Sequence, residues 1–146
     1  MKHNLKLNIE LVPASSWNNN LRSILKPYMW NNIRKEVYKR YNNKCTICAT
    51  SGPLHAHEVW KYDDKNHVQC LTNIVALCKN CHAVKHFGLT ELEDSKGKMD
   101  KEKIIKHFMK VNKCSRDIFL KHKTKAMKLF EERSKHDWLL NIGKLS

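Results

Sequence analysis

The sequence predicts a single α+β domain held together at its centre by a metal, and three observations lead to that prediction. The chain has 146 residues, which is enough for one modest core. Short segments with the two-residue period of strands alternate with segments of helical period. Two Cys-x-x-Cys pairs lie in the middle of the chain, and in a reducing compartment such pairs are more typical of metal ligands than of disulfides.

The first segment, residues 1–44, predicts a strand followed by helical structure. Residues 5–11 alternate between apolar and polar side chains, as expected for a half-buried strand, and Pro13 with the polar residues after it ends that pattern. Residues 27–41 carry apolar side chains at helical spacing, and Pro27 suits the first turn of that helix. We therefore expect this segment to lead by a helix into the first cysteine pair.

The second segment, residues 45–90, predicts short elements. Residues 54–60 and 71–77 are apolar enough for strands, and residues 62–66 indicate a polar loop between them. A helix is expected from about residue 80 to residue 86, with Gly88 well placed to end it.

The third segment, residues 91–146, predicts a basic extension of two helices after a surface linker at residues 94–98. Asp100 and Ser115 are suited to cap these helices, and the apolar stripe of the second extends as far as Trp138. From residue 96 to the end there are 15 Lys or Arg and 6 Asp or Glu. The three segments are expected to form one compact domain.

The charge of the chain favours a polyanionic partner. Lys and Arg number 28 against 14 Asp and Glu, so the formal net charge is +14 and the isoelectric point is near 9.6. Nucleic acid and acidic membrane surfaces are the usual partners of such proteins. No apolar segment is long enough to cross a bilayer, and residues 1–4 lack the features of a secretion signal. We expect a cytoplasmic protein that binds nucleic acid and no membrane.

The four paired cysteines predict a structural zinc site. Thiolates two residues apart on a tight turn can each take one vertex of a tetrahedron, and two such turns complete a closed site that stabilises the fold. Two buried disulfides are the alternative. Cys70 and Cys114 belong to no such pattern and are expected to be ordinary thiols. The predicted ligands are Cys45, Cys48, Cys78 and Cys81.

Four histidines near the cysteine pairs predict a second metal site. His82 and His86 are four residues apart on an expected helix, so their imidazoles share a face and can hold a metal or a phosphate. His55 and His57 are two residues apart on an expected strand and also share a face, whereas Glu58 would point to the opposite face. Any one of them alone would be an ordinary surface residue; their joint placement around the cysteines indicates chemistry.

Residues 45–89 resemble the HNH nuclease family, in the branch that carries four cysteines. The resemblance implies a ββα-metal core, in which a strand bears the first histidine and a loop asparagine and a helix histidine complete the site. His57 matches the first histidine, Asn73 the asparagine and His82 the last histidine, while His86 matches a further histidine one turn later. The helix before the first cysteine pair also resembles the family, but the residues beyond about 90 do not.

The pair His57–Glu58 leaves two assignments open. Many members of the family carry His-His or Asp-His here, the first residue binding metal and the second acting as general base. If His57 is the ligand, Glu58 takes the position of the base; if His57 is the base, Ala56 takes the ligand position, and His55 or Glu58 must bind the metal instead. We favour His57 as the base, because an imidazole titrates near neutral pH and an unshifted glutamate is a weaker proton acceptor.

The resemblance implies a metal-dependent endonuclease that hydrolyses phosphodiester bonds, in DNA first of all, and leaves a 5′ phosphate. The expected cofactors are a structural Zn²⁺ and a catalytic Mg²⁺ or Mn²⁺ held by His82 with His86 or Glu58, and His55 is a further candidate ligand. Imidazole ligands also suit Ni²⁺ or Zn²⁺. Asn73 would orient the base or brace its loop.

Two other functions fit the same sequence. A zinc-ribbon protein could bind nucleic acid without cutting it, and a protein-interaction module could serve a larger nuclease or defence complex. The lysines at positions 121, 123, 125 and 128 either form an ordinary solvated surface or contact phosphates in a nuclease or a binder. A homodimer or a partner protein is compatible with each of these functions.

Overall fold

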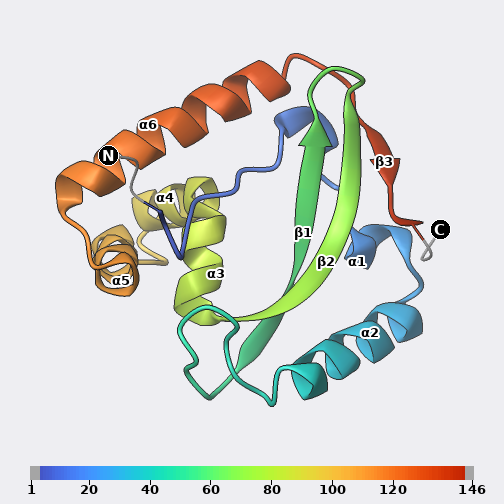
Figure 1. Ribbon diagram of the computed structural model, residues 1–146, viewed down its shortest axis with the longest axis horizontal. Helices are drawn as coiled ribbons and strands as arrows, with labels where there is room; N and C mark the ends of the chain where they lie inside the picture. Colours follow the sequence, from blue (N-terminus) through green and yellow to red (C-terminus); the bar gives the residue numbers. More distant parts are fainter. Residues whose placement is uncertain (1–3, 144–146) are drawn as a thin grey trace.

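The computed structural model describes residues 4–143 and has a three-stranded sheet with helices on both of its sides, which confirms the α+β class (Figure 1). Residues 1–3 and 144–146 lie outside the described residues. They include the start of the first predicted segment, the end of the third, and most of residues 1–4, which were considered above for a secretion signal. In chain order the elements are the 3-10 helix η1 (Ala14–Ser16), α1 (Leu21–Ile24), α2 (Pro27–Arg40), β1 (Leu54–Asp63), β2 (Val68–Cys78), α3 (Lys79–Lys85), α4 (Phe87–Ser95), α5 (Lys101–Asn112), α6 (Arg116–Arg133) and β3 (Leu139–Asn141).

The sheet has the order β1-β2-β3, so β1 is an edge strand. β1 and β2 form an antiparallel hairpin whose register shifts between Val59 and Trp60, and β3 runs parallel to the first residues of β2. The helix α3 follows β2 without a loop, because Cys78 is both the last residue of the strand and the N-cap of the helix. Strand, strand and helix therefore follow one another directly in the chain.

Alternation along β2 divides the interior into two apolar clusters. Ile74 and Ala76 face α1 and α2, where they join a cluster that includes Trp30. Val75 and Leu77 face the other way and join a larger cluster that is built mainly from α3, α4, α5 and α6. His55 and His57 of β1 lie opposite Leu77 and Val75 and so belong to the α3 side of the sheet. The members of the larger cluster with bulky rings are Phe87, Phe108 and Phe119.

The predicted strand at residues 5–11 is wrong. This stretch belongs to no sheet: it bends at Lys6 and Leu7 beside α3 and α4 and then runs toward η1 (Figure 1). Its alternation does bury Leu7 and Ile9. Side chains replace the missing strand partner, because the backbone N–H of Leu7 donates to Asn112 Oδ1 and that of Ile9 donates to His122 Nε2.

Three further details differ from expectation. The strand β1 continues through Asp63 and so includes the first two residues of the expected polar loop, while residues 64–66 form the turn as expected. Gly88 does not end a helix, since the chain turns at His86 and continues as α4, in which Gly88 approaches Leu11. The last predicted helix ends at Arg133 rather than reaching Trp138, which is buried beside the start of the unpredicted strand β3.

Helices α2, α5 and α6 are confirmed, with their expected first turns. Pro27 occupies the first turn of α2. The carboxylate of Asp100 accepts hydrogen bonds from the first backbone N–H groups of α5, and the hydroxyl of Ser115 accepts one in α6. Across residues 4–143, we find no helix with the length and apolar character that a membrane span requires.

Candidate metal centres

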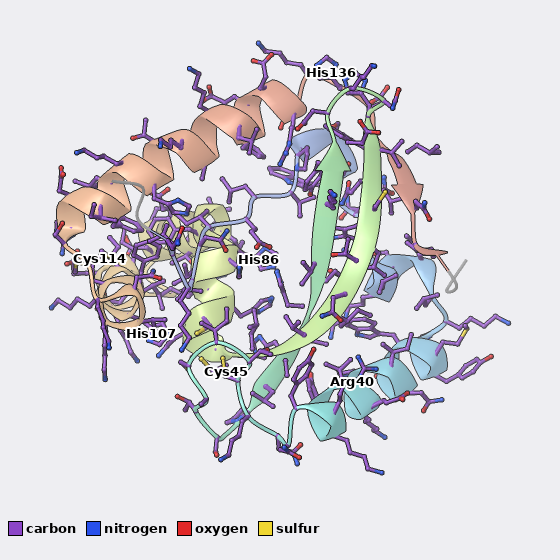
Figure 2. The ribbon with its side chains drawn as sticks, in the orientation of Figure 1. Arg40, Cys45, His86, His107, Cys114 and His136 are labelled. Carbon is purple, nitrogen blue, oxygen red and sulfur yellow. The ribbon has the colours of Figure 1, made fainter. Side chains whose placement is uncertain are left out.

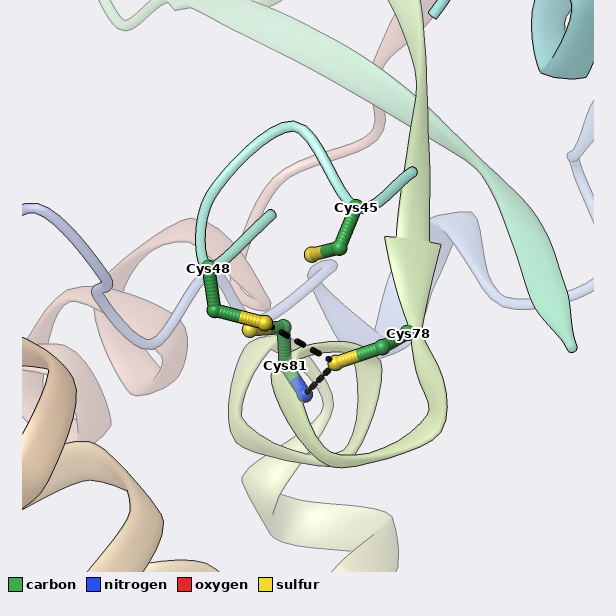
Figure 3. Close-up of side chains that lie close together, drawn as sticks. All are labelled: Cys45, Cys48, Cys78 and Cys81. Atoms are coloured by element: carbon green, nitrogen blue, oxygen red, sulfur yellow. Dashed lines mark hydrogen bonds between the residues drawn. The ribbon is translucent and has the colours of Figure 1, made fainter. Parts of the chain in front are cut away.

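The four paired cysteines meet at the junction of three elements (Figure 3). Cys45 and Cys48 lie on the loop after α2, Cys78 ends β2, and Cys81 lies in the first turn of α3. Their sulfur atoms all lie within 4.8 Å of one another, and the Sγ atoms of Cys48 and Cys78 are 3.6 Å apart. All four are free thiols rather than disulfides.

Backbone hydrogen bonds shape the loop that carries the first two cysteines. The N–H of Ala49 donates to the carbonyl of Cys45 at 2.9 Å, and that of Cys45 donates to the carbonyl of Thr50 at 3.0 Å. Ala49 takes a left-handed conformation with φ of 63°, which closes the turn. The N–H of Thr46 donates to Ala76 of β2, so the loop is tied to the sheet.

The electrostatics of the sulfur cluster favour a bound cation. A hydrogen bond from the Cys81 thiol lowers the pKa of Cys45 to about 4, whereas burial raises the pKa of Cys78. Close sulfurs resist collective deprotonation unless a cation neutralises them. His107 Nε2 lies 3.2 Å from the Sγ of Cys81 and can donate a hydrogen bond to that thiolate. Four sulfurs at this spacing are a donor set suited to zinc.

Three of the predicted histidines form a second cluster on the α3 side of the sheet. One ring nitrogen from each of His57, His82 and His86 lies within 4.8 Å of the others. The ring centroids of His57 and His86 are 5.1 Å apart and those of His82 and His86 are 4.7 Å apart. In Figure 2, His86 projects from α3 into the space toward β1. The strand and helix therefore bring together imidazoles that are 25 to 29 residues apart in the chain.

Two imidazoles of this cluster, those of His82 and His86, are held in the neutral form that binds metals. Burial, with the neighbouring histidines, lowers the pKa of His82 to about 3 and that of His86 to about 4. Each ring thus keeps a free lone pair at neutral pH. The three convergent imidazoles are a donor set that fits a divalent transition-metal ion.

His55 lies beside this cluster rather than within it. Its Nδ1 is 2.7 Å from the Nδ1 of His82, so one ring donates a hydrogen bond to the other. The side chain of His55 is exposed, and burial of its ring on one side, together with Lys79 and Arg22, lowers its pKa. A ring in this position can orient His82 through the nitrogen that faces away from an ion.

Glu10 also faces the cluster, and sequence reasoning missed it. Its carboxylate lies 3.6 Å from His57 Nε2 and accepts a hydrogen bond from the buried ammonium of Lys85 at 2.8 Å. Burial alone would raise the pKa of Glu10, but His57 and Lys85 outweigh that effect and lower the pKa to about 2. The carboxylate is thus ionised and lies beside one nitrogen of His57, at a distance longer than a hydrogen bond. No motif links Glu10 to the histidines, because the contact depends on the path of residues 4–13.

Glu58 and Asn73 lie outside the imidazole cluster. The carboxylate of Glu58 accepts a hydrogen bond at 3.2 Å from the backbone N–H of Leu21, the first residue of α1. Burial raises the pKa of Glu58, which the contact with Leu21 partly offsets. Asn73 pairs with Val59 at the irregular point of the hairpin, and its side-chain oxygen accepts a hydrogen bond from the N–H of Ile74.

Two cavities border the histidines. One, of about 370 Å³, includes Glu10 and His57 in its lining. The other is an open groove of about 920 Å³ that includes His55 and His82. His86 and Glu58 line both cavities, so the imidazole cluster lies where a ligand from solvent can reach it.

No protein-family model matches the chain, and comparison with curated proteins and with solved structures gave no significant match.

Proposed function

We propose that this protein is a metal-dependent endonuclease of the HNH type that hydrolyses phosphodiester bonds in nucleic acid, with DNA as the first substrate to test. The observation that carries the proposal is the convergence of His57 from β1 with His82 and His86 from α3, next to a separate group of four sulfurs. A purely structural zinc ribbon needs the sulfurs but has no use for a second cluster of imidazoles beside an open groove.

The geometry supports His57 as a metal ligand rather than as the general base that we favoured from the sequence. His57 is buried, and one of its nitrogens lies with those of His82 and His86. The carboxylate of Glu10 lies 3.6 Å from its Nε2 atom, close enough that a small shift would form the carboxylate–imidazole hydrogen bond that orients a metal ligand. A general base, by contrast, must reach the attacking water.

Glu58 then takes the position of the base. It follows His57 in the chain, lines both cavities, and has a pKa raised by burial, which makes it a stronger proton acceptor than an ordinary glutamate. In the proposed hydrolysis, Glu58 accepts a proton from water, the water oxygen bonds to phosphorus, and the bond from phosphorus to the 3′ oxygen breaks. The departing 3′ oxygen takes a proton from a solvent water. The products are a 5′ phosphate and a 3′ hydroxyl.

The ligand set gives the bound ion a defined task. A divalent ion at His57, His82 and His86 would neutralise the charge that develops on the scissile phosphate and on the departing oxygen. Mg²⁺ and Mn²⁺ are the first ions to test, and Ni²⁺ or Zn²⁺ suit the all-imidazole donor set.

Plasmid nicking tests the proposal. Zinc-loaded protein is incubated with supercoiled plasmid and Mg²⁺, Mn²⁺, Ni²⁺ or additional Zn²⁺, with His82→Ala as the inactive variant and His136→Ala as the matched control. We expect nicking with at least one ion, loss of nicking in His82→Ala, and full nicking in His136→Ala, whose ring stacks on His67 away from the cluster. Equal nicking by all three proteins would contradict the proposal, because a contaminating nuclease would explain it.

One observation favours a non-catalytic nucleic-acid binder instead. Glu58 is engaged by the N–H of Leu21, and the strand places it on the side opposite His57. A protein of that kind would bind plasmid with unchanged affinity in every variant and would nick it with none of the ions.

A further inference from the structure

We propose that the open groove beside the histidines binds unpaired nucleotides, so that the substrate carries a single-stranded segment next to the phosphate that is cut. The proposal rests on the proposed nuclease function for its location, but binding can be measured without cleavage. The groove of about 920 Å³ begins at His55, His82 and His86 and continues past the edge strand β1 toward α2. A strand lying in it would pass directly beside the imidazole cluster.

Aromatic side chains line the part of the groove that lies beyond the histidines. Trp17 is 61% exposed, although large apolar side chains are usually covered. Its indole is held in place, because its Nε1 donates a hydrogen bond to the carbonyl of Val12 and its ring stacks on Phe130 with centroids 6.1 Å apart. Trp30, Tyr38 and Trp60 also line the groove. A fixed, exposed indole is a platform on which an unstacked base can lie.

Polar groups in the groove lack partners within the described residues. Trp30 is only 8% exposed, yet its indole N–H makes no hydrogen bond to any described residue, and the same holds for the Nε of Arg34. Both residues line the groove. Buried donors are normally satisfied, and the carbonyl or ring-nitrogen acceptors on a base edge would satisfy these. The other end of the Arg34 guanidinium donates to Asn31, which fixes its orientation.

The positive charge of the groove and of the chain favours a nucleic-acid strand over a neutral or basic partner. Arg22 is exposed on α1 and lines the groove. Burial lowers the pKa of His55 and raises that of Glu58, and the positive charge of the nearby Arg22 has a further, lowering effect on both. A phosphate approaching the histidines would therefore meet Arg22. The rest of the chain, at +14, attracts polyanions in general. The aromatic faces select unpaired bases, because a duplex hides the faces of its bases within the stack.

Binding of short oligonucleotides tests the proposal. Zinc-loaded full-length protein, without any further divalent ion, is titrated into a fluorescein-labelled 12-mer of thymidylate or a blunt 12-base-pair duplex, and anisotropy is recorded. We expect the single strand to bind about tenfold more tightly than the duplex. Trp17→Ala should weaken binding of the single strand about five- to a hundredfold, the range that loss of one stacked base gives. Tyr28→Ala is the matched control, since Tyr28 is 62% exposed on α2 and lies outside the groove.

Three results would overturn the proposal. They are equal affinity for duplex and single strand, equal effects of Trp17→Ala and Tyr28→Ala, and displacement of the oligonucleotide by polyglutamate at equal charge, which would indicate an acidic protein partner. The two proposals fail separately. Selective binding of the single strand without nicking contradicts only the nuclease, and nicking without that selectivity contradicts only the groove assignment.

Discussion

The cysteine cluster and the histidine cluster differ in how they connect to the rest of the molecule. Cys45 and Cys81 are members of the larger apolar cluster, so the sulfur site lies inside the folding core. The histidine site instead borders two cavities, and His55 at its margin is exposed. Metal ligands buried in a core contribute to folding, whereas ligands that open to solvent are free for exchange and chemistry. Stability and activity should therefore depend on different residues.

Replacing a cysteine ligand should have the greatest effect on the fold. Cys48→Ser removes one sulfur from a site that could hold a structural zinc, and such an ion contributes on the order of 10 kcal/mol to folding in small zinc domains. We expect the cooperative thermal transition, followed by circular dichroism, to disappear. Cys114→Ser is the matched control, since Cys114 is a half-buried thiol outside the site, and its transition should move by a few degrees at most. An unchanged transition in Cys48→Ser would show that the sulfur site does not stabilise the fold.

Replacing a histidine ligand should have the opposite profile. His82→Ala should lower the rate of plasmid nicking at least about a thousandfold, because ion-assisted charge neutralisation contributes several kcal/mol. The thermal transition should remain within a few degrees of the parent. If His82→Ala and Cys48→Ser unfold alike, the two clusters do not have separate roles.

Variants of Glu58 and His55 distinguish a residue that takes a proton from one that orients a metal ligand. Glu58→Gln keeps the size of the side chain and its acceptor for the N–H of Leu21 but cannot take a proton at neutral pH, so nicking should fall about a hundredfold or more. His55→Ala should reduce affinity for the added ion by about tenfold, and a higher concentration of that ion should restore the activity of this variant. The measurement is the nicking rate as a function of ion concentration. Recovery of Glu58→Gln at high ion concentration would exclude it as the base.

His107 provides the smallest test of the sulfur site. Its Nε2 lies 3.2 Å from Cys81 Sγ, and loss of such a contact commonly costs about ten- to a hundredfold in metal affinity. His107→Ala should therefore release zinc faster to a chromogenic chelator while it leaves nicking by the loaded protein unchanged. His136→Ala should release zinc at the parental rate.

Local patterns in the sequence predicted those parts of the fold that depend on local interactions. The caps at Asp100 and Ser115 and the proline at the start of α2 act within one helical turn, so their roles could be inferred directly. The cysteines and histidines were predicted as two groups because each lies within a few residues of a partner. The structure gathers all four cysteines in one cluster and three of the four histidines in another. Their chemistry remains a prediction.

Distant contacts explain what the sequence did not reveal. Alternation in residues 5–11 correctly indicated burial of Leu7 and Ile9. Their backbone N–H groups, however, donate to the side chains of Asn112 and His122, which are more than 100 residues away. The same path places Glu10 against His57, a contact that no spacing rule predicts. The strand β3 has only three residues, and the four helices α3 to α6 separate it in the chain from β2, with which it pairs. In each case the partner follows from tertiary packing rather than from local periodicity.

Anomalous scattering from zinc-loaded crystals soaked in Mn²⁺ would test the two-metal arrangement most directly, because zinc and manganese can each be located with X-rays at the absorption edge of that metal. We expect a zinc peak among the sulfurs of Cys45, Cys48, Cys78 and Cys81 and a manganese peak among the nitrogens of His57, His82 and His86. Zinc in the sulfur site with no manganese peak at the histidines would contradict a catalytic ion there.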